Sequence, residues 1–311
     1  MTTPLICIDD PILGGGDPDG LIALAGIAAL RLPLLGLIAT RTPVARRAAA
    51  ARYALDRHGA GAVPIGIGSD VGTASPDTRT PSPWQTDPGT ATRDEVAALL
   101  ADQPPRSVRL SVTGPMTDAA WLIDQPHLWQ AVGQVAIMGA VDPDGPASNN
   151  QQDPDAAIGF YHRLAELNTP TTIIDSTAAI WAHIPTRVWL DAEASGDSWV
   201  AAVGHAMHRQ WERLWHGVAT GLLPHRSVQW YLDGWCDGAA PAPGESPRVV
   251  GTPAYDVLTV AALVSDEPLG IMEPHPRWSN MHVLRPDPAA GPARAVEAQM
   301  RLINAALGPR S

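Results

Sequence analysis

The sequence predicts an α/β fold with an open, mostly parallel central sheet flanked by helices. The chain has 311 residues, of which 45% are hydrophobic, and this is enough for one core of that size class. Short apolar runs alternate with helical patterns from Leu5 to Ile67, and turns rich in Gly, Pro and Asp separate them. Such a strand-helix-strand alternation indicates parallel strands with helices on both faces.

Each element is predicted from its local pattern. Short apolar runs predict strands at residues 5–8, 34–39, 63–67, 108–112, 134–138 and 171–174. Helical periodicity predicts helices at residues 21–30, 46–58, 95–101, 116–123, 255–264 and 297–307. Residues 69–92 are rich in Pro, Ser, Thr and Asp, so we expect a long surface loop there.

Tryptophan is concentrated in the middle of the chain. Nine of the 11 Trp residues fall between Trp121 and Trp235, and Trp211 and Trp215 are four residues apart on one helical face. We expect residues 195–238 to form a helical, Trp-rich cap within one domain that spans residues 1–311. Large flat side chains of this kind either pack a core or stack on an aromatic ligand.

Composition excludes several classes of function. The chain carries 21 basic and 32 acidic side chains, a net charge of -11, which disfavours a nucleic-acid polymer as partner. Every basic residue is Arg, so Schiff-base and P-loop lysine chemistry are excluded. Cys7 and Cys236 are too few for a disulfide framework or a Cys-rich zinc site. We find neither a leader pattern nor an apolar run of roughly 20 residues, and expect a cytoplasmic protein without a membrane partner that acts on a small molecule.

Carboxylates cluster at the predicted end of the first strand. Asp9, Asp10, Asp17 and Asp19 fall within eleven residues, and ligands of parallel sheets bind at the carboxyl ends of strands. Either Asp17 or Asp19 taken alone is equally well explained as a helix cap. Four crowded carboxylates repel one another unless a hard cation such as Ca²⁺ or a polyhydroxyl ligand holds them.

Two further clusters follow predicted strands. Thr113-Gly114-Pro115 comes after the strand at 108–112, and Asn149-Asn150 precedes Asp153 and Pro154. Either cluster alone is also explained as an ordinary turn or helix cap.

The motifs taken together resemble a known family. They are the Asp-rich first strand end, Val-Thr-Gly-Pro-Met-Thr-Asp at 112–118, Val-Ala-Ile-Met-Gly-Ala at 135–140, Asn-Asn-Gln-Gln-Asp-Pro-Asp-Ala-Ala at 149–157 and Tyr-Asp-Val-Leu-Thr-Val-Ala at 255–261. In this order they resemble the inosine-uridine preferring nucleoside hydrolases, the Ca²⁺-dependent N-ribohydrolases. The resemblance covers most of the chain and implies that family's fold and a homodimer or homotetramer.

The resemblance also implies roles for single residues. Asp10, which precedes Pro11, matches the Asp that binds Ca²⁺ and deprotonates the attacking water. Asp19 and Asn149 match residues that bind the ribose. The carbonyl of Ile137 and the side chain of Asp256 match further ligands of the metal.

The chain departs from the family pattern at four positions that matter for chemistry. Gly20 stands where the family has a chelating Asp, although Asp17 or Asp9 is near enough in sequence to replace it. Tyr255 stands where many members have a His that protonates the leaving base, and Ala147 replaces a Glu. The Asn expected after the second strand is missing. We therefore expect Ca²⁺ binding to be weak or absent.

Three hypotheses follow from these observations. The first is a hydrolase that cleaves the N-glycosidic bond of a nucleoside or nucleoside-like substrate through a water activated by Asp10. In this hypothesis Tyr255 is the proton donor, and Trp211 and Trp215 stack on the aglycone. The second is a repurposed, Ca²⁺-independent enzyme of specialised metabolism that acts on a non-nucleoside substrate. The third is a non-catalytic binding protein. His205 is an alternative acid, although a surface position is the commoner role for such a histidine.

Overall fold

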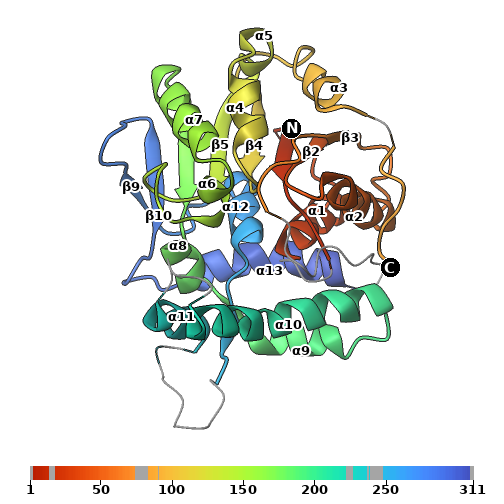
Figure 1. Ribbon diagram of the computed structural model, residues 1–311, viewed down its shortest axis with the longest axis vertical. Coiled ribbons are helices and arrows are strands. Elements are labelled where there is room, and N and C mark those ends of the chain that lie inside the picture. The colour runs from red at the N-terminus through yellow and green to blue at the C-terminus, as the bar shows by residue number, and fades with distance from the viewer. Residues whose placement is uncertain are drawn as a thin grey trace.

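A computed structural model describes residues 3–13, 18–73, 83–89, 91–221, 227–236, 238 and 248–308. Within these residues, eight strands form one sheet in the order β3-β2-β1-β4-β5-β6-β10-β9. Every neighbouring pair in this sheet is parallel except β10 and β9. The predicted fold class, an α/β protein with a mostly parallel central sheet flanked by helices, is confirmed (Figure 1).

The bounds of the strands agree closely with the sequence pattern. The strands are β1 (Leu5–Asp9), β2 (Leu34–Ala39), β3 (Ile65–Ile67), β4 (Val108–Val112), β5 (Val132–Met138), β6 (Thr171–Ile174), β7 (Ile184–Pro185), β8 (Gly251–Thr252), β9 (Ile271–Pro274) and β10 (Met281–Arg285). β7 and β8 pair antiparallel in a small separate sheet. The sequence pattern gave no indication of β7 to β10.

The helices pack on both faces of the large sheet. They are α1 (Asp19–Ala29), α2 (Val44–Arg57), α3 (Arg93–Ala98), α4 (Thr117–Ile123), α5 (Pro126–Trp129), α6 (Ser148–Gln152), α7 (Pro154–Glu166), α8 (Ser176–Trp181), α9 (Thr186–Glu193), α10 (Ser198–Ala219), α11 (Val228–Trp235), α12 (Tyr255–Val264) and α13 (Ala293–Leu307). The expected start of the last helix, residue 297, is wrong because the helix begins one turn earlier at Ala293.

Alternation along the strands separates two cores. Leu5 and Cys7 of β1 pack with α1, α2, α12 and α13, whereas Ile6 and Ile8 pack with α3, α4, α5 and α7. This is the period of two expected for a strand buried on both faces. The sheet is therefore the middle of three layers, and the carboxyl ends of its strands form one edge.

Three helices lie together outside these layers. In Figure 1, α9, α10 and α11 lie along the lower part of the molecule, where α10 contacts both α9 and α11. α11 and the second half of α10 bury an aromatic cluster of their own, made of Val218, Tyr231, Leu232, Trp235 and Cys236. The helical character expected for residues 195–238 is thus present in α10 and α11.

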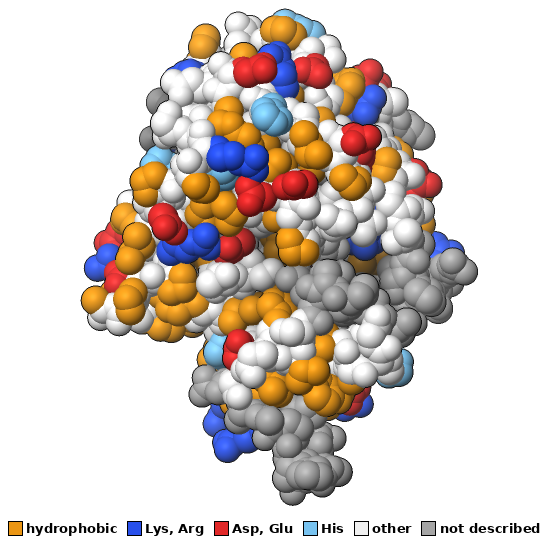
Figure 2. Space-filling model, turned by 60° about the vertical axis from the view of Figure 1, so that its left-hand side comes forward, with side chains coloured by type: hydrophobic (Ala, Val, Ile, Leu, Met, Phe, Trp, Pro, Cys, Tyr) orange, Lys and Arg blue, Asp and Glu red, His pale blue; other side chains and the backbone are white. Residues whose placement is uncertain are grey.

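The described surface is mixed in character. Large exposed apolar side chains lie on different elements and include Ile158, Leu167, Leu190, Val228, Ile271 and Met272. On the face in Figure 2, acidic and basic side chains are interspersed with apolar ones. No helix among the described residues has both the length and the apolar composition needed to cross a bilayer.

Candidate active site

Three carboxylates converge where β1 meets α12. Asp9 is the last residue of β1, Asp10 follows it, and Asp256 is the second residue of α12. One carboxylate oxygen from each of them lies within 4.8 Å of the others, and Asp9 and Asp256 are buried. Such a set of oxygens is able to hold a metal ion.

Asp9 is the most deeply buried member of this cluster. Its side chain is 2% exposed, and its Oδ1 has no hydrogen-bond partner among the described residues. Burial, and next the negative charge of Asp10, raise the pKa of Asp9 to about 7, although the Thr113 side chain and the main chain of Asp10 hydrogen-bond to it. Asp9 is thus suited to exchange a proton near neutral pH.

Asp10 has a different environment because two arginines face it. Nη1 of Arg41 donates to Asp10 Oδ2 over 2.7 Å, and Nη1 of Arg47 lies 3.6 Å from the same oxygen. Arg47 also donates to the main-chain oxygen of Asp10. Arg47 is 3% exposed, and its burial lowers its pKa while Asp10 counteracts this effect. The Asp10 carboxylate is therefore engaged in ion pairs.

Asp19 joins two helices at the site. Its Oδ2 accepts a hydrogen bond of 2.9 Å from the main-chain nitrogen of Asp256, so that the first turn of α1 holds the first turn of α12. A carboxylate at the amino end of a helix is favourable because it binds an unpaired main-chain N–H and opposes the helix dipole. The residue expected to bind ribose is thus buried and also has a structural function.

Gly20 is a contact point between α1 and the acidic cluster. A Cβ atom at this position would lie 2.8 Å and 2.9 Å from the two carboxylate oxygens of Asp9 and 3.1 Å from Oδ2 of Asp256. The carboxylates of Asp9 and Asp256 therefore approach the helix backbone where other residues carry a side chain. Asp17, the other candidate to replace the missing ligand, lies outside the described residues.

The loop after β4 closes one side of the cluster. A Cβ at Gly114 would lie 2.5 Å from Thr40 Cγ2 and 3.1 Å from the nitrogen of Asp10, so this glycine permits the close approach of two strand ends. Asn149, 6% exposed, donates from Nδ2 to the carbonyl of Thr113 over 2.8 Å and to that of Met138 over 3.2 Å. These bonds anchor Asn149 to the ends of β4 and β5.

Ile137 lies in β5, where it pairs with Val112 of β4 and with Ile173 of β6. Its side chain is fully buried. The structure thus places it near the carboxyl end of a central strand, and the role of its carbonyl as a metal ligand stays a prediction.

Tyr255 links the acidic cluster to the aromatic helices. It is the first residue of α12, next to Asp256, and packs against the aromatic cluster of α10 and α11. Trp211 and Trp215 pack against the same cluster, and the ring of Trp215 lies 5.1 Å from that of Tyr231. These contacts give Trp211 and Trp215 a packing role, and their proposed contact with substrate stays a prediction.

His205 lies on the outer side of this region. Its side chain is 61% exposed, and its Nδ1 lies 2.7 Å from Oε1 of Glu193 on α9. The other carboxylate oxygen of Glu193 contacts His208. His205 therefore takes the surface position that was the alternative to a role as acid.

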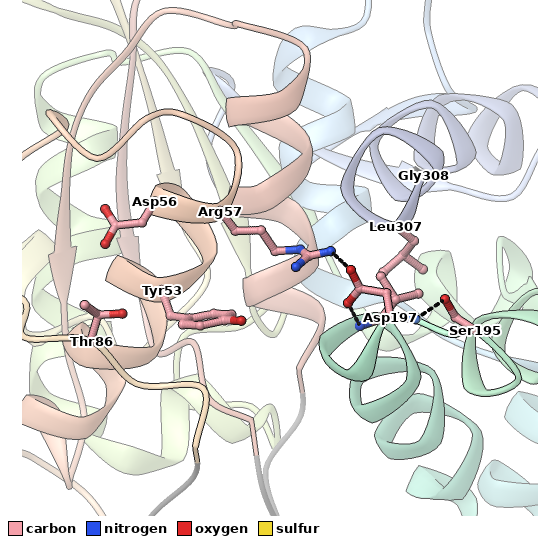
Figure 3. A pocket seen from close by; sticks show the side chains of 9 residues that line it. Tyr53, Asp56, Arg57, Thr86, Ser195, Asp197, Leu307 and Gly308 are labelled. Carbon is pink, nitrogen blue, oxygen red and sulfur yellow. Dashed lines mark hydrogen bonds and ion pairs between the residues drawn. The ribbon is translucent and has the colours of Figure 1, made fainter. Parts of the chain in front are cut away.

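A pocket of about 770 Å³ is found at a different place. Figure 3 shows Arg57 of α2 reaching across it to Asp197 at the start of α10. Its lining residues are Tyr53, Asp56, Arg57, Thr86, Ser195, Asp197, Val200, Leu307 and Gly308. None of these belongs to the acidic cluster, so we locate the chemistry at the carboxylates rather than in this pocket.

Sequence reasoning missed two arginines of the site. Arg41 and Arg47 follow β2, and polar residues after a predicted strand were the signal that drew attention to the other clusters. The same rule applied to the strand at 34–39 would have found Arg41. The central position of Asp9 was also missed, because the family motif directs attention to Asp10.

Comparison with known proteins supports the architecture. No family model matches the sequence, and no curated protein matches it. Among solved structures, the type III effector protein XopQ, in complex with adenosine diphosphate ribose, matches with a TM-score of 0.77 and 23% identity over 99% of this chain and 95% of that chain. The effector protein XOO4466 matches with a TM-score of 0.79 and 22% identity over 99% of this chain and 94% of that one.

Enzymes of the same architecture match as well. The plant nucleoside hydrolase PpNRh1 matches with a TM-score of 0.64 and 13% identity over 99% of this chain and 100% of that chain. A purine-preferring ribonucleoside hydrolase from Gardnerella vaginalis matches with a TM-score of 0.58 and 18% identity over 97% and 99% of the two chains. The chain therefore has the nucleoside hydrolase fold, in a divergent form.

Proposed function

We propose that this chain is a hydrolase that cleaves the N-glycosidic bond of a nucleoside or nucleoside-like substrate. One observation carries the proposal: a buried carboxylate oxygen of Asp9 lacks a hydrogen-bond partner among the described residues and lies in a cluster with Asp10 and Asp256. A buried polar atom left without a partner is costly, so its retention is explained if a water or a ligand binds there. The nucleoside hydrolases that share the fold support this reaction class.

We assign the general base to Asp9 rather than to Asp10. Asp10 Oδ2 forms ion pairs with Arg41 and with the buried Arg47, whereas Asp9 Oδ1 has no hydrogen-bond donor among the described residues. A water bound to Asp9 loses a proton to this oxygen as its own oxygen attacks C1′ of the sugar. Negative potential from the remaining carboxylates stabilises the positive charge that develops on the sugar ring.

Other residues bind the sugar and assist the leaving group. Asn149 uses its amide nitrogen to anchor itself, which leaves the amide oxygen as the acceptor for a sugar hydroxyl. Asp19 lies beside Asp256 and binds a second hydroxyl. Tyr255 donates a proton to the departing base. Trp211 and Trp215 pack against the same aromatic cluster as Tyr255.

A divalent cation fits the acidic cluster, because one carboxylate oxygen from each of three residues lies close to the others, and Asp9 has a buried oxygen without a hydrogen-bond partner among the described residues. Asp9, Asp10 and Asp256 would hold Ca²⁺, which when bound would lower the pKa of a coordinated water. Arg41 and Arg47 oppose its binding by placing positive charge at Asp10. We therefore propose that the cation binds weakly.

The alternative function is a Ca²⁺-independent enzyme that acts on a non-nucleoside substrate. The same arginines favour it, since they supply at Asp10 part of the positive charge that a cation provides. The third hypothesis, a ligand-binding protein without catalysis, is compatible with the effectors that share the fold.

A substrate panel tests these proposals. Purified protein is incubated with purine and pyrimidine nucleosides, nucleotides and ADP-ribose, with and without added Ca²⁺, and the release of free base and of reducing sugar is measured. We expect at least one ribosyl compound to be cleaved, and the cleavage to be lost in Asp9→Asn. Binding without cleavage across the whole panel would favour the binding protein, and neither binding nor cleavage of any panel compound, with or without Ca²⁺, would favour the alternative enzyme with a non-nucleoside substrate.

A further inference from the structure

Arg41 and Arg47 form a cationic pair at the edge of the acidic cluster. Both side chains point to one carboxylate: Nη1 of Arg41 lies 2.7 Å from Asp10 Oδ2, and Nη1 of Arg47 lies 3.6 Å from it. The two differ in accessibility, because the side chain of Arg47 is 3% exposed and that of Arg41 is 21% exposed. Arg41 is thus the member of the pair that a ligand is able to reach.

Arg47 has acidic neighbours besides Asp10, because the charges of Asp9 and Asp70 also act on it. Arg47 is fixed to Asp10 by its bond to the main-chain oxygen and also donates to the carbonyl of Thr42 over 3.4 Å. Arg47 by itself offsets the charge of one carboxylate, so Arg41 is able to exchange Asp10 for an incoming anion. In addition, the Nε atoms of both arginines are buried without an acceptor among the described residues.

The backbone holds Arg41 in a conformation that L-residues rarely adopt, with φ at 70°. Its main-chain nitrogen donates to the carbonyl of Ser69 over 2.9 Å, and the nitrogen of Thr40 donates to the carbonyl of Asp9 over 2.9 Å. These bonds fix the loop after β2 between the end of β1 and the segment that follows β3. The fold therefore maintains a strained position that directs an arginine to the ligand-binding edge of the sheet.

The start of α2 adds to the positive potential. Its first turn contains Arg46 and Arg47 but no acidic residue. Cations at the amino end of a helix oppose the helix dipole, so this arrangement does not stabilise the helix. It does favour an anion, since helix amino ends and arginine forks are the usual binding groups for phosphate. The main-chain nitrogen of Val44, at the start of this turn, donates to Oδ1 of Asp70 over 3.1 Å.

We propose that Arg41 binds a phosphate of the substrate, and hence that the substrate is a phosphorylated nucleoside, such as a nucleoside diphosphate derivative, rather than a free nucleoside. This inference rests on the proposed function for the identity of the sugar and base. The ribose hydroxyls bind at Asp19 and Asn149, and the phosphate binds at the arginine edge of the same site. Arg47 keeps Asp10 neutralised while Arg41 turns to the phosphate.

Calorimetric binding to the full chain in EDTA tests this inference without requiring turnover. The probes are adenosine, ADP-ribose and inorganic pyrophosphate, and the variant is Arg41→Gln. Arg187→Gln is the control, because Arg187 on α9 has an 88% exposed side chain. We expect ADP-ribose to bind at least about tenfold more tightly than adenosine, and Arg41→Gln to remove this difference while adenosine binding and the control variant stay unchanged.

A second measurement uses the unaltered protein, in case the variant folds poorly. The affinity for ADP-ribose is expected to fall as NaCl rises from about 50 to 500 mM, while the affinity for adenosine changes little. Equal affinities for adenosine and ADP-ribose would overturn the inference. So would an equal loss of both in Arg41→Gln, which would make Arg41 a positioning residue for Asp10, or tight binding of pyrophosphate alone, which would indicate a separate anion site. If ADP-ribose binds through Arg41 but is never cleaved, the proposed hydrolase function fails and the phosphate site stands.

Discussion

Asp9 and Asp10 are neighbours in sequence with opposite surroundings. Asp9 ends a buried strand and has an unpaired carboxylate oxygen, whereas Asp10 lies beyond the strand and is paired with Arg41 and Arg47. The family resemblance assigns the base to Asp10 because it precedes Pro11. The difference arises from Arg41 in the loop after β2 and Arg47 in the first turn of α2. No motif includes these arginines, so the sequence alone is unable to rank the two carboxylates.

Replacing each carboxylate separately tests this assignment. On any substrate that the panel identifies, we expect Asp9→Asn to lower kcat at least about 100-fold, because an amide is unable to accept the proton of the water. Asp10→Asn is expected to lower kcat only about tenfold, because it removes charge but not the proton acceptor. The measurement is steady-state kinetics on folded variants. A larger loss for Asp10→Asn than for Asp9→Asn would return the base to Asp10.

The raised pKa of Asp9 also predicts a pH dependence of stability. Its pKa is about 7 in the folded protein and near 3.8 in the unfolded chain, so between these values the folded state binds more protons. Asp9 therefore contributes stability that is fully present below about pH 4 and is lost as pH rises through 7. At pH 8 we expect Asp9→Asn to be more stable than the parent, by on the order of 4 kcal/mol, with the difference shrinking toward pH 5.

Urea unfolding in EDTA at several pH values measures this difference. Asp266→Asn is a suitable control because Asp266 is exposed, and we expect its unfolding free energy to follow that of the parent at every pH. A lower stability of Asp9→Asn at pH 8 would show that the Asp9 charge is well solvated or paired.

At the scale of elements, the sequence predicts the buried strands and helices, because burial gives these elements a continuous apolar pattern. The bounds of β2, β4, β6 and α12 agree with the pattern residue for residue. β9 has every residue exposed and ends in proline, so it lacks the apolar alternation by which a strand is recognised. Its place at the sheet edge depends on its pairing with β10, which is a tertiary contact.

Two glycines in helices provide a matched test of the contact between α1 and the acidic cluster. A Cβ at Gly20 would lie within 2.9 Å of both Asp9 carboxylate oxygens, whereas a Cβ at Gly159 in α7 would meet no atom within 4 Å. We expect Gly20→Ala to destabilise the protein by about 1 to 3 kcal/mol through overpacking. Gly159→Ala is expected to stabilise it by about 0.5 to 1 kcal/mol through helix propensity. Chemical denaturation measures both, and equal effects would mean that Asp9 moves away from α1 freely.

At the scale of the whole molecule, the site is assembled from segments far apart in sequence. β1 supplies Asp9, α1 supplies Asp19, α12 supplies Asp256, and the loop after β2 supplies Arg41. Motif order was enough to predict the acidic residues, because a motif is local. The arginines were missed because their approach to Asp10 depends on the path of the loop, which only the folded chain defines.

This assembly determines how the protein is expected to respond to calcium. Ca²⁺ takes six to eight oxygen ligands, and the described site offers one carboxylate oxygen each from Asp9, Asp10 and Asp256. Gly20 contributes no side chain, and Asp10 must leave Arg41 to coordinate an ion fully. We therefore expect calorimetric titration of metal-stripped protein to give a calcium dissociation constant well above about one micromolar. A value of about one micromolar is typical of calcium-sensor sites. Arg41→Gln is expected to bind Ca²⁺ more tightly than the parent, because it removes a competing cation from Asp10. A dissociation constant near or below a micromolar in the parent would show that other oxygens complete the site and that the metal-dependent mechanism applies to this chain.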